Sequence, residues 1–308
     1  MKKFILKIFL FIAPVVVVVV AFIIIYHESL PAPKITSSLS LNEKLIRFRR
    51  TKADFLVIGS SMSLSNFNSE RMVKWINSDS YFNFSSWGSK MHDSWLQTRI
   101  YCSYHQPKIV FINSNIVDFR KEDIVYDEKE VEKYFQSYPW NDWWYYLNHI
   151  DVNYYLVQAK DLKPLLQTDL DYSSLLFDKY GAIPFGDTNF KKEDDRWNEK
   201  HDTIKALEFQ YECLDSLSDF LMGKKIKFVF IYCPTRKELS SSYQAENILN
   251  NKKRVKEIVE KHGGLFYDSS EIVWDDSLFV DSIHFNKKGS ATYTDSCMKK
   301  VLPYLIRD

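Results

Sequence analysis

The sequence predicts an α/β fold: a three-layer α/β/α sandwich in which helices cover both faces of a central parallel sheet. Two short runs, residues 55–58 and 228–232, are continuously apolar, as strands buried on both faces of a parallel sheet are. Longer amphipathic segments alternate with such runs, which is the pattern of a parallel sheet flanked by helices. An apolar stretch of membrane-spanning length precedes them, and an aromatic-rich region interrupts the alternation.

The apolar stretch is the first expected element. Residues 4–26 are interrupted only by Lys7 and Pro14, and about 20 apolar residues suffice to span a bilayer. Two further lysines precede the stretch, so the positive-inside rule leaves the N-terminus in the cytoplasm. We therefore expect residues 1–28 to form the anchor of a single-pass protein of the cytoplasmic membrane, with the folded domain in the periplasm or at the cell surface.

Two other interpretations of this stretch are weaker. A cleaved signal peptide has an apolar core of about 7–15 residues and a small-x-small cleavage site, and residues 27–33 offer a poor one. A buried core helix is disfavoured because the β-branched run at residues 15–20 lies at the extreme N-terminus. The membrane anchor is the preferred hypothesis.

The rest of the chain divides into a linker and one interrupted domain. Residues 29–40 are rich in Pro and Ser, which predicts a linker, and residues 41–308 are expected to fold as one domain. Strands are expected at residues 54–59, 81–84, 108–113, 227–233 and 265–268, and helices near residues 69–77, 89–104, 202–222, 244–262 and 286–306. A mixed helix and loop insertion is expected at about 120–201. Its aromatic residues at 138–155 could stack on sugar rings, although packing in a core is the favoured explanation.

Charge and cysteine content restrict the class of function. Of the net charge of +1, residues 1–28 hold +2, so the exported part is near −1 and no nucleic-acid surface is expected. The four cysteines show no C-x-x-C spacing, and buried thiols are at least as well favoured as disulfides. There is no H-E-x-x-H motif or carboxylate cluster of ligand spacing, so we expect no metal and no cofactor.

The turn after the first strand offers a candidate nucleophile. In an open parallel sheet, ligands bind at the carboxyl ends of the strands. Gly59 allows a tight turn there, and Ser61, two residues later, would stand at a helix N-terminus whose free N–H groups can stabilise an oxyanion. A plain helix cap is an equally good explanation of this serine-rich turn.

The turns after the next two strands offer donors for an oxyanion hole. The second strand leads to Gly88, whose backbone N–H is unobstructed, and the third to Asn113 and Asn115, whose side chains are neutral donors. Each of these residues is also common in loops for turn geometry alone.

The most informative pattern lies near the C-terminus. Asp281 precedes His284 by three residues in a loop that enters a helix, so its carboxylate can bind imidazole Nδ1 and leave Nε2 to take a proton from a serine. Of the seven histidines only His284 has this setting. A solvated loop histidine is the competing explanation.

Together these residues resemble the SGNH (GDSL-like) hydrolase superfamily. Ser61 matches the nucleophile, Gly88 and Asn115 match the oxyanion residues, and Asp281 with His284 match the D-x-x-H block. The resemblance implies a flavodoxin-like three-layer sandwich and a Ser-His-Asp triad. It also implies that the N–H groups of Ser61 and Gly88, with the Asn115 amide, form the oxyanion hole.

The resemblance departs from the family pattern in its third block. That block normally reads Gly-x-Asn-Asp, whereas residues 113–116 read Asn-Ser-Asn-Ile, which leaves open whether Asn113 or Asn115 faces the oxyanion. In the first block, Ser60 stands where the hydrolases usually carry Asp, a form similar to that of members that acylate the cell envelope.

The implied reaction is serine-dependent acyl transfer. Similar anchored members act in O-acetylation of cell-surface polysaccharides, often beside a membrane O-acyltransferase. We therefore expect an esterase or O-acetyltransferase that acts on O-acyl groups of a cell-envelope polysaccharide, with a membrane O-acyltransferase as a partner. The alternative is a catalytically inactive subunit that binds glycan or assists assembly beside that partner.

Overall fold

Five parallel strands form the centre of the protein. The computed structural model describes residues 2–26, 34–36, 38–48, 51–120, 177–186 and 195–306, together with the single positions 129, 131, 132, 134, 153 and 156. The strands are β1 (Phe55–Ile58), β2 (Tyr81–Asn83), β3 (Ile109–Ser114), β4 (Lys227–Tyr232) and β5 (Leu265–Asp268). They lie in the order β2-β1-β3-β4-β5, and every neighbouring pair is parallel. The expected parallel sheet is confirmed.

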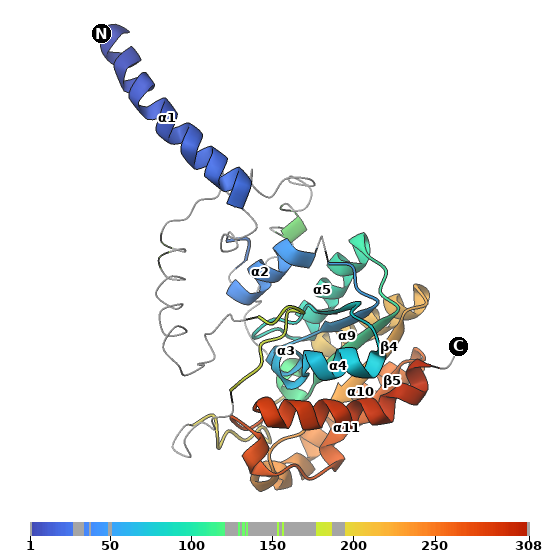
Figure 1. Cartoon of the computed structure of the whole chain (residues 1–308). Coiled ribbons are helices and arrows are strands. Elements are labelled where there is room, and N and C mark those ends of the chain that lie inside the picture. Colours follow the sequence, from blue (N-terminus) through green and yellow to red (C-terminus); the bar gives the residue numbers. More distant parts are fainter. Residues whose placement is uncertain are drawn as a thin grey trace.

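Helices cover both faces of this sheet, which confirms the three layers (Figure 1). One face is covered by α2 (Leu39–Phe48), α5 (Met91–Tyr104), α9 (Glu208–Gly223) and α10 (Glu246–Lys261). The other face is covered by α3 (Ser61–Asn66), α4 (Ser69–Ile76) and α11 (Lys287–Leu305). Short 3-10 helices are η2 (Ile116–Phe119), η4 (Lys237–Gln244), η5 (Ser269–Glu271) and η6 (Asp276–Leu278).

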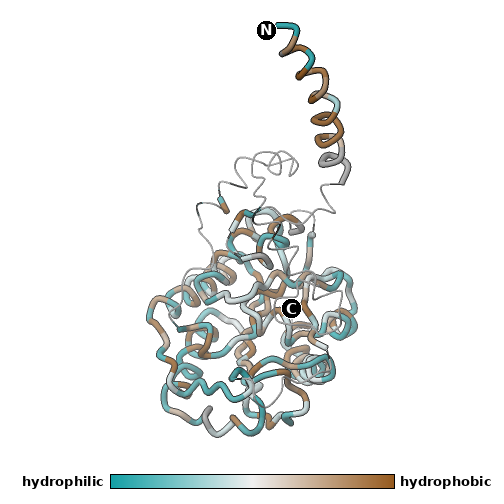
Figure 2. Tube along the Cα trace, turned by 90° about the vertical axis from the view of Figure 1, so that its left-hand side faces the viewer, coloured by the Kyte–Doolittle hydropathy of each residue, from teal (hydrophilic) through white to brown (hydrophobic). Residues whose placement is uncertain are grey.

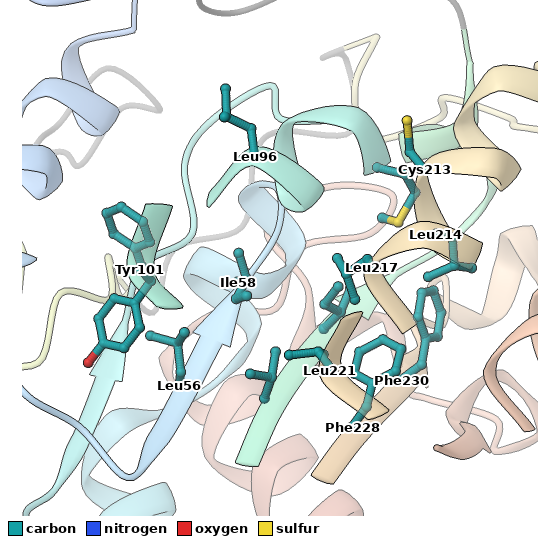
Figure 3. Packing of buried hydrophobic residues seen from close by; sticks show 14 of the residues in the cluster. Leu56, Ile58, Leu96, Tyr101, Cys213, Leu214, Leu217, Leu221, Phe228 and Phe230 are labelled. Carbon is teal, nitrogen blue, oxygen red and sulfur yellow. The ribbon is translucent and has the colours of Figure 1, made fainter. Parts of the chain in front are cut away.

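The alternation of side chains along each strand produces two cores. Leu56 and Ile58 of β1 point to one face, where they join Phe228 and Phe230 of β4 under the leucines of α9 (Figure 3). Val57 points to the opposite face and packs with residues of α4 and α11. Both faces of the sheet are therefore apolar, which explains why the strand sequences lack polar alternation.

Helix α9 begins later than the sequence indicates. The expected helix near residues 202–222 is observed at Glu208–Gly223. The backbone N–H of Leu207 donates to the carbonyl of Phe119 at 2.8 Å, and this bond ties the preceding chain to η2. A long-range backbone bond of this kind leaves no local sequence signal, so the helix boundary could not be predicted.

Helix α2 was not expected. Its residues Leu41 and Leu45 are fully buried, and the buried Lys44 donates from Nζ to the carbonyl of Asn83 at 2.6 Å. Within the predicted linker, residues 29–33 and 37 lie outside the described residues, while Ile35, Thr36 and Ser40 are buried. The described chain therefore packs on the sheet domain from residue 35 onward.

Helix α1 (Lys2–Tyr26) is long and apolar enough to cross a membrane. Its candidate span, Lys2–Ala21, is not buried, whereas a core helix of a globular domain would be. Figures 1 and 2 show it projecting from the rest of the protein, with apolar residues along most of its length. A signal anchor and a signal sequence both fit this helix.

The expected insertion lies largely outside the described residues. This holds for most of residues 120–201, and within the aromatic-rich range 138–155 only residue 153 is described. The described parts of the insertion are short, and they include residues 177–186 and 195–201, which pack near the candidate site described below.

The four cysteines carry free thiols, and all four lie within the described ranges. Burial raises the pKa of the Cys102 and Cys213 thiols to about 11. Both thiols are therefore protonated at neutral pH. Because the thiolate is the reactive form, they are inert there.

Removing α2 should destabilise the domain. We expect a chain that begins at residue 51 to melt about 5–10 °C below one that begins at residue 34, because the apolar surface under Leu41 and Leu45 becomes exposed. Thermal unfolding followed by circular dichroism measures the difference. Equal melting temperatures would show that α2 contributes nothing to the fold.

Candidate active site

A tight turn presents Ser61 at the carboxyl end of β1. Gly59 has a φ of 128°, and a Cβ at this position would lie 2.6 Å from Ser63 Oγ, so the turn requires glycine. Ser60 caps α3 by accepting a hydrogen bond from the Met62 N–H at 3.3 Å. Ser61 is therefore the first residue of α3, and its side chain is partly exposed.

The loop before α11 presents Asp281 and His284. One carboxylate oxygen, Oδ1, accepts from the backbone N–H groups of Ile283 at 2.9 Å and His284 at 2.7 Å. The other, Oδ2, lies 2.7 Å from His284 Nδ1. Asp281 therefore fixes both the backbone of the loop and the orientation of the imidazole.

The structure brings the three expected residues together. His284 Nε2 lies 2.8 Å from Ser61 Oγ, so hydroxyl, imidazole and carboxylate form one continuous line of hydrogen bonds. The side chains of His284 and Asp281 are buried, which reduces competition from water for these bonds.

Asn66, which the sequence analysis missed, holds the two segments at this distance. It lies at the end of α3 and is fully buried. Its Nδ2 donates to the carbonyl of Ile283 at 3.0 Å, and its Oδ1 accepts from the N–H of Phe285 at 2.9 Å. The amide thus binds the backbone on both sides of His284. In the sequence, the only indication of this role was a polar residue on a short helix that proves to be buried.

The candidate oxyanion residues occupy different environments. Gly88 lies in an exposed turn with a φ of 72°. Asn115 is buried and caps η2, accepting at Oδ1 from the Val117 N–H at 2.9 Å. Asn113 donates from Nδ2 to the Met62 carbonyl at 3.0 Å and accepts at Oδ1 from Tyr293 at 2.6 Å. The Asn113 amide is therefore engaged in the framework beneath α3.

Two aromatic rings flank His284, and the sequence analysis did not identify either of them as part of the site. The centroids of Trp87 and Phe185 lie 6.2 Å and 5.8 Å from that of the imidazole, and both rings meet it edge-on. Phe185 belongs to the described segment 177–186. That segment is bound along the site by a hydrogen bond from the Ile183 N–H to the carbonyl of Leu64 at 3.2 Å.

A second histidine lies buried behind the loop. His201 Nε2 lies 3.4 Å from Ser282 Oγ. Burial, together with the nearby Arg120 and His284, lowers the pKa of His201 to about 4. His201 is therefore neutral at physiological pH and adds no charge beside His284.

Arg236 binds the loop that carries Asp281 and His284. Its guanidinium is buried and binds Asp276 and Glu238 at 2.8 Å and 2.7 Å, while Nε donates to the Trp197 carbonyl at 2.9 Å. Its backbone N–H donates to the carbonyl of Ser282 at 3.2 Å. The loop that carries Asp281 is thus tied to the described end of the insertion.

A buried carboxylate lies beneath the nucleophile turn. Asp118 Oδ2 accepts from Ser60 Oγ at 2.8 Å and from Ser114 Oγ at 2.7 Å. Burial raises the pKa of Asp118 to about 6, although Lys90 and the two hydroxyls oppose the shift. Among the described residues, no group of three or more His, Cys, Asp or Glu side chains could hold a metal ion.

Among the comparisons with known proteins, only the search of solved structures found similar proteins. No family model matches the chain, and no curated protein matches it significantly. Solved structures that match include a crystal structure at 2.00 Å resolution of a Bacteroides fragilis NCTC 9343 protein described as a "putative acylhydrolase". The TM-score is 0.41 and the identity 13%, over 85% of this chain and 97% of that one.

The raised pKa of Asp118 has a consequence for stability. The folded-state pKa of about 6 exceeds the ordinary value of 3.8, so the unfolding free energy falls as pH rises between these values. Asn does not titrate, so Asp118→Asn does not lose stability in this way. We expect the unfolding free energy of the variant to rise by on the order of 2 kcal/mol relative to that of the wild type between pH 4 and pH 7.

Urea unfolding of both proteins at the two pH values measures this gain. All other titrating groups are common to the two proteins and cancel in the difference. A difference that does not change with pH would contradict the raised pKa.

Proposed function

We propose that this protein catalyses serine-dependent acyl transfer, as an esterase or an O-acetyltransferase, on O-acyl groups of a cell-envelope polysaccharide. The observation that carries the proposal is the line of hydrogen bonds from Ser61 through His284 to Asp281. This arrangement is the one that a serine nucleophile needs, because the hydroxyl is weakly reactive until a base takes its proton.

In the proposed reaction, His284 Nε2 takes the proton from Ser61 Oγ as the oxygen attacks the ester carbonyl. Asp281 stabilises the resulting imidazolium and keeps Nε2 directed at the serine. The tetrahedral intermediate expels the sugar alcohol, which receives the proton from His284. Water or another hydroxyl then attacks the acyl-enzyme by the same steps in reverse and restores the free serine.

The oxyanion is assigned to the N–H groups of Ser61 and Gly88 and to the amide of Asn115. Ser61 is the first residue of α3, so its N–H has no partner within the helix. Of the two asparagines in the third block, Asn115 is the one that matches the family pattern, and the Asn113 side chain binds Met62 and Tyr293.

Helix α1 supports the assignment to the cell envelope. As a signal anchor with its lysines in the cytoplasm, it would tether the site outside the membrane, where acylated glycans are available. The site would then lie beside any membrane O-acyltransferase that supplies or shares the acyl group. The aromatic rings of Trp87 and Phe185 next to His284 offer apolar surface for a sugar or an acyl group.

Covalent labelling tests the enzyme assignment. We expect a fluorophosphonate probe to label the wild-type protein, Ser61→Ala to abolish labelling and His284→Ala to slow it at least about 1000-fold, because the serine then lacks its base. In-gel fluorescence measures the rate. Ser65→Ala is a matched control on the same helix, because its buried hydroxyl has no hydrogen-bond partner among the described residues.

Labelling of the control at the wild-type rate would show that the losses are specific to the site. A wild-type protein that is not labelled through Ser61 would favour the alternative, a catalytically inactive subunit that binds glycan or assists assembly.

The fate of the acyl group separates transfer from hydrolysis. The purified protein is given an acetyl donor with and without a de-acetylated envelope polysaccharide, and acetylated glycan and free acetate are measured. For a transferase we expect the polysaccharide to divert acetyl groups from acetate into glycan, because a bound hydroxyl competes with water for the acyl-enzyme. A product mixture that is unchanged by the acceptor would identify an esterase.

A further inference from the structure

We propose that Asp118 is a positioning residue for the nucleophile, and that its negative charge holds the Ser61 turn in the reactive geometry. The inference rests on the proposed function and adds a residue to it. The side-chain hydrogen bonds of Asp118 are with Ser60 and Ser114 and do not involve Ser61 or His284. It acts through Ser60, the residue that caps the helix on which Ser61 stands.

The contacts of Asp118 tie two strand ends together. Its Oδ2 accepts from Ser60, which follows β1, and from Ser114, which ends β3. Asp118 also lies within η2, and its N–H donates to the carbonyl of Asn115 at 3.1 Å. One carboxylate therefore fixes the turn of the candidate nucleophile and the segment of the candidate oxyanion asparagine.

The charge strengthens both hydroxyl contacts. A hydrogen bond to an ionised acceptor is roughly twice as strong as one between neutral groups. With its Oγ hydrogen committed to Asp118, Ser60 presents its lone pairs to the Met62 N–H, which defines the first turn of α3. Loss of the charge would loosen this turn and let Ser61 Oγ leave the line to His284.

The surroundings of Asp118 allow it to be charged at neutral pH. Lys90 and Arg120 are the cations that favour its ionised form, and Ser60 and Ser114 act in the same direction. Cys233 also faces it, and burial raises the pKa of that thiol, so it stays protonated and neutral. The carboxyl group therefore ionises close to pH 6 and is negative above it.

A purely structural role does not explain the charge. Burying a carboxylate destabilises the fold, and a neutral side chain of the same shape could accept the same two hydrogen bonds. The fold retains a group that is unfavourable to stability directly beneath the candidate nucleophile. Such groups are concentrated at functional sites.

The test compares Asp118→Asn and Asp118→Ala with the full-length wild-type protein in detergent, using p-nitrophenyl acetate as the ester. At pH 8 we expect kcat to fall about 10-fold in Asp118→Asn and about 100-fold in Asp118→Ala, with KM unchanged, because only the geometry of the serine is altered. The wild-type to Asp118→Asn ratio of kcat should approach one at pH 5, where the wild-type carboxyl group is protonated.

The pH dependence of the ratio isolates Asp118, because titration of His284 is common to both proteins and cancels. Asp268→Asn is the control: this carboxylate lies at the end of β5, caps the 3-10 helix η5, and contacts Ser270 and Lys252. We expect it to retain wild-type kcat at both pH values.

The outcomes separate the two hypotheses. If the wild-type protein shows no Ser61-dependent turnover, the proposed function fails and this inference fails with it. If the wild-type protein turns over and the ratio is the same at pH 5 and pH 8, or both Asp118 variants stay within twofold of wild type, the function stands and the role of Asp118 is overturned.

Discussion

The side chain of Asn66 joins two parts of the chain that lie 217 residues apart, and the geometry of the candidate site depends on that contact. Ser61 and Asn66 are the first and last residues of the short helix α3. The helix therefore fixes the serine relative to the loop of His284, which Asn66 binds. The local bonds of Asp281 shape the loop, but they cannot set its distance from β1. The Asn66 amide supplies that constraint.

The sheet could be predicted because its signal is local. Strands buried on both faces are continuous apolar runs, and all five were found at positions close to those observed. Helix α2 contains no such continuous run, because polar residues are interspersed among its apolar ones. The burial of Lys44 depends on a carbonyl of β2 that no sequence pattern links to it.

Some residues of the candidate site could likewise be identified from local sequence patterns, and others could not. Ser61, Asp281 and His284 were found because their spacing within each segment is itself the pattern, and the structure brings them together. Asn66 and Phe185 were missed because their positions become meaningful only when distant segments meet. The contacts of the Asn113 side chain with Met62 and with Tyr293 on α11 also appear only in the fold, because these residues lie far from Asn113 in the sequence.

If α1 anchors the chain in a membrane, the packing of α2 limits how far the sheet domain can lie from the bilayer. Ser40 accepts a hydrogen bond from the Trp87 N–H in the loop that leads to Gly88, so the chain is already bound to the domain at this point. Seven residues, 27–33, separate α1 from the next described residue, and such a stretch reaches at most about 25 Å when fully extended. A domain anchored through α1 would therefore stay close to the bilayer surface.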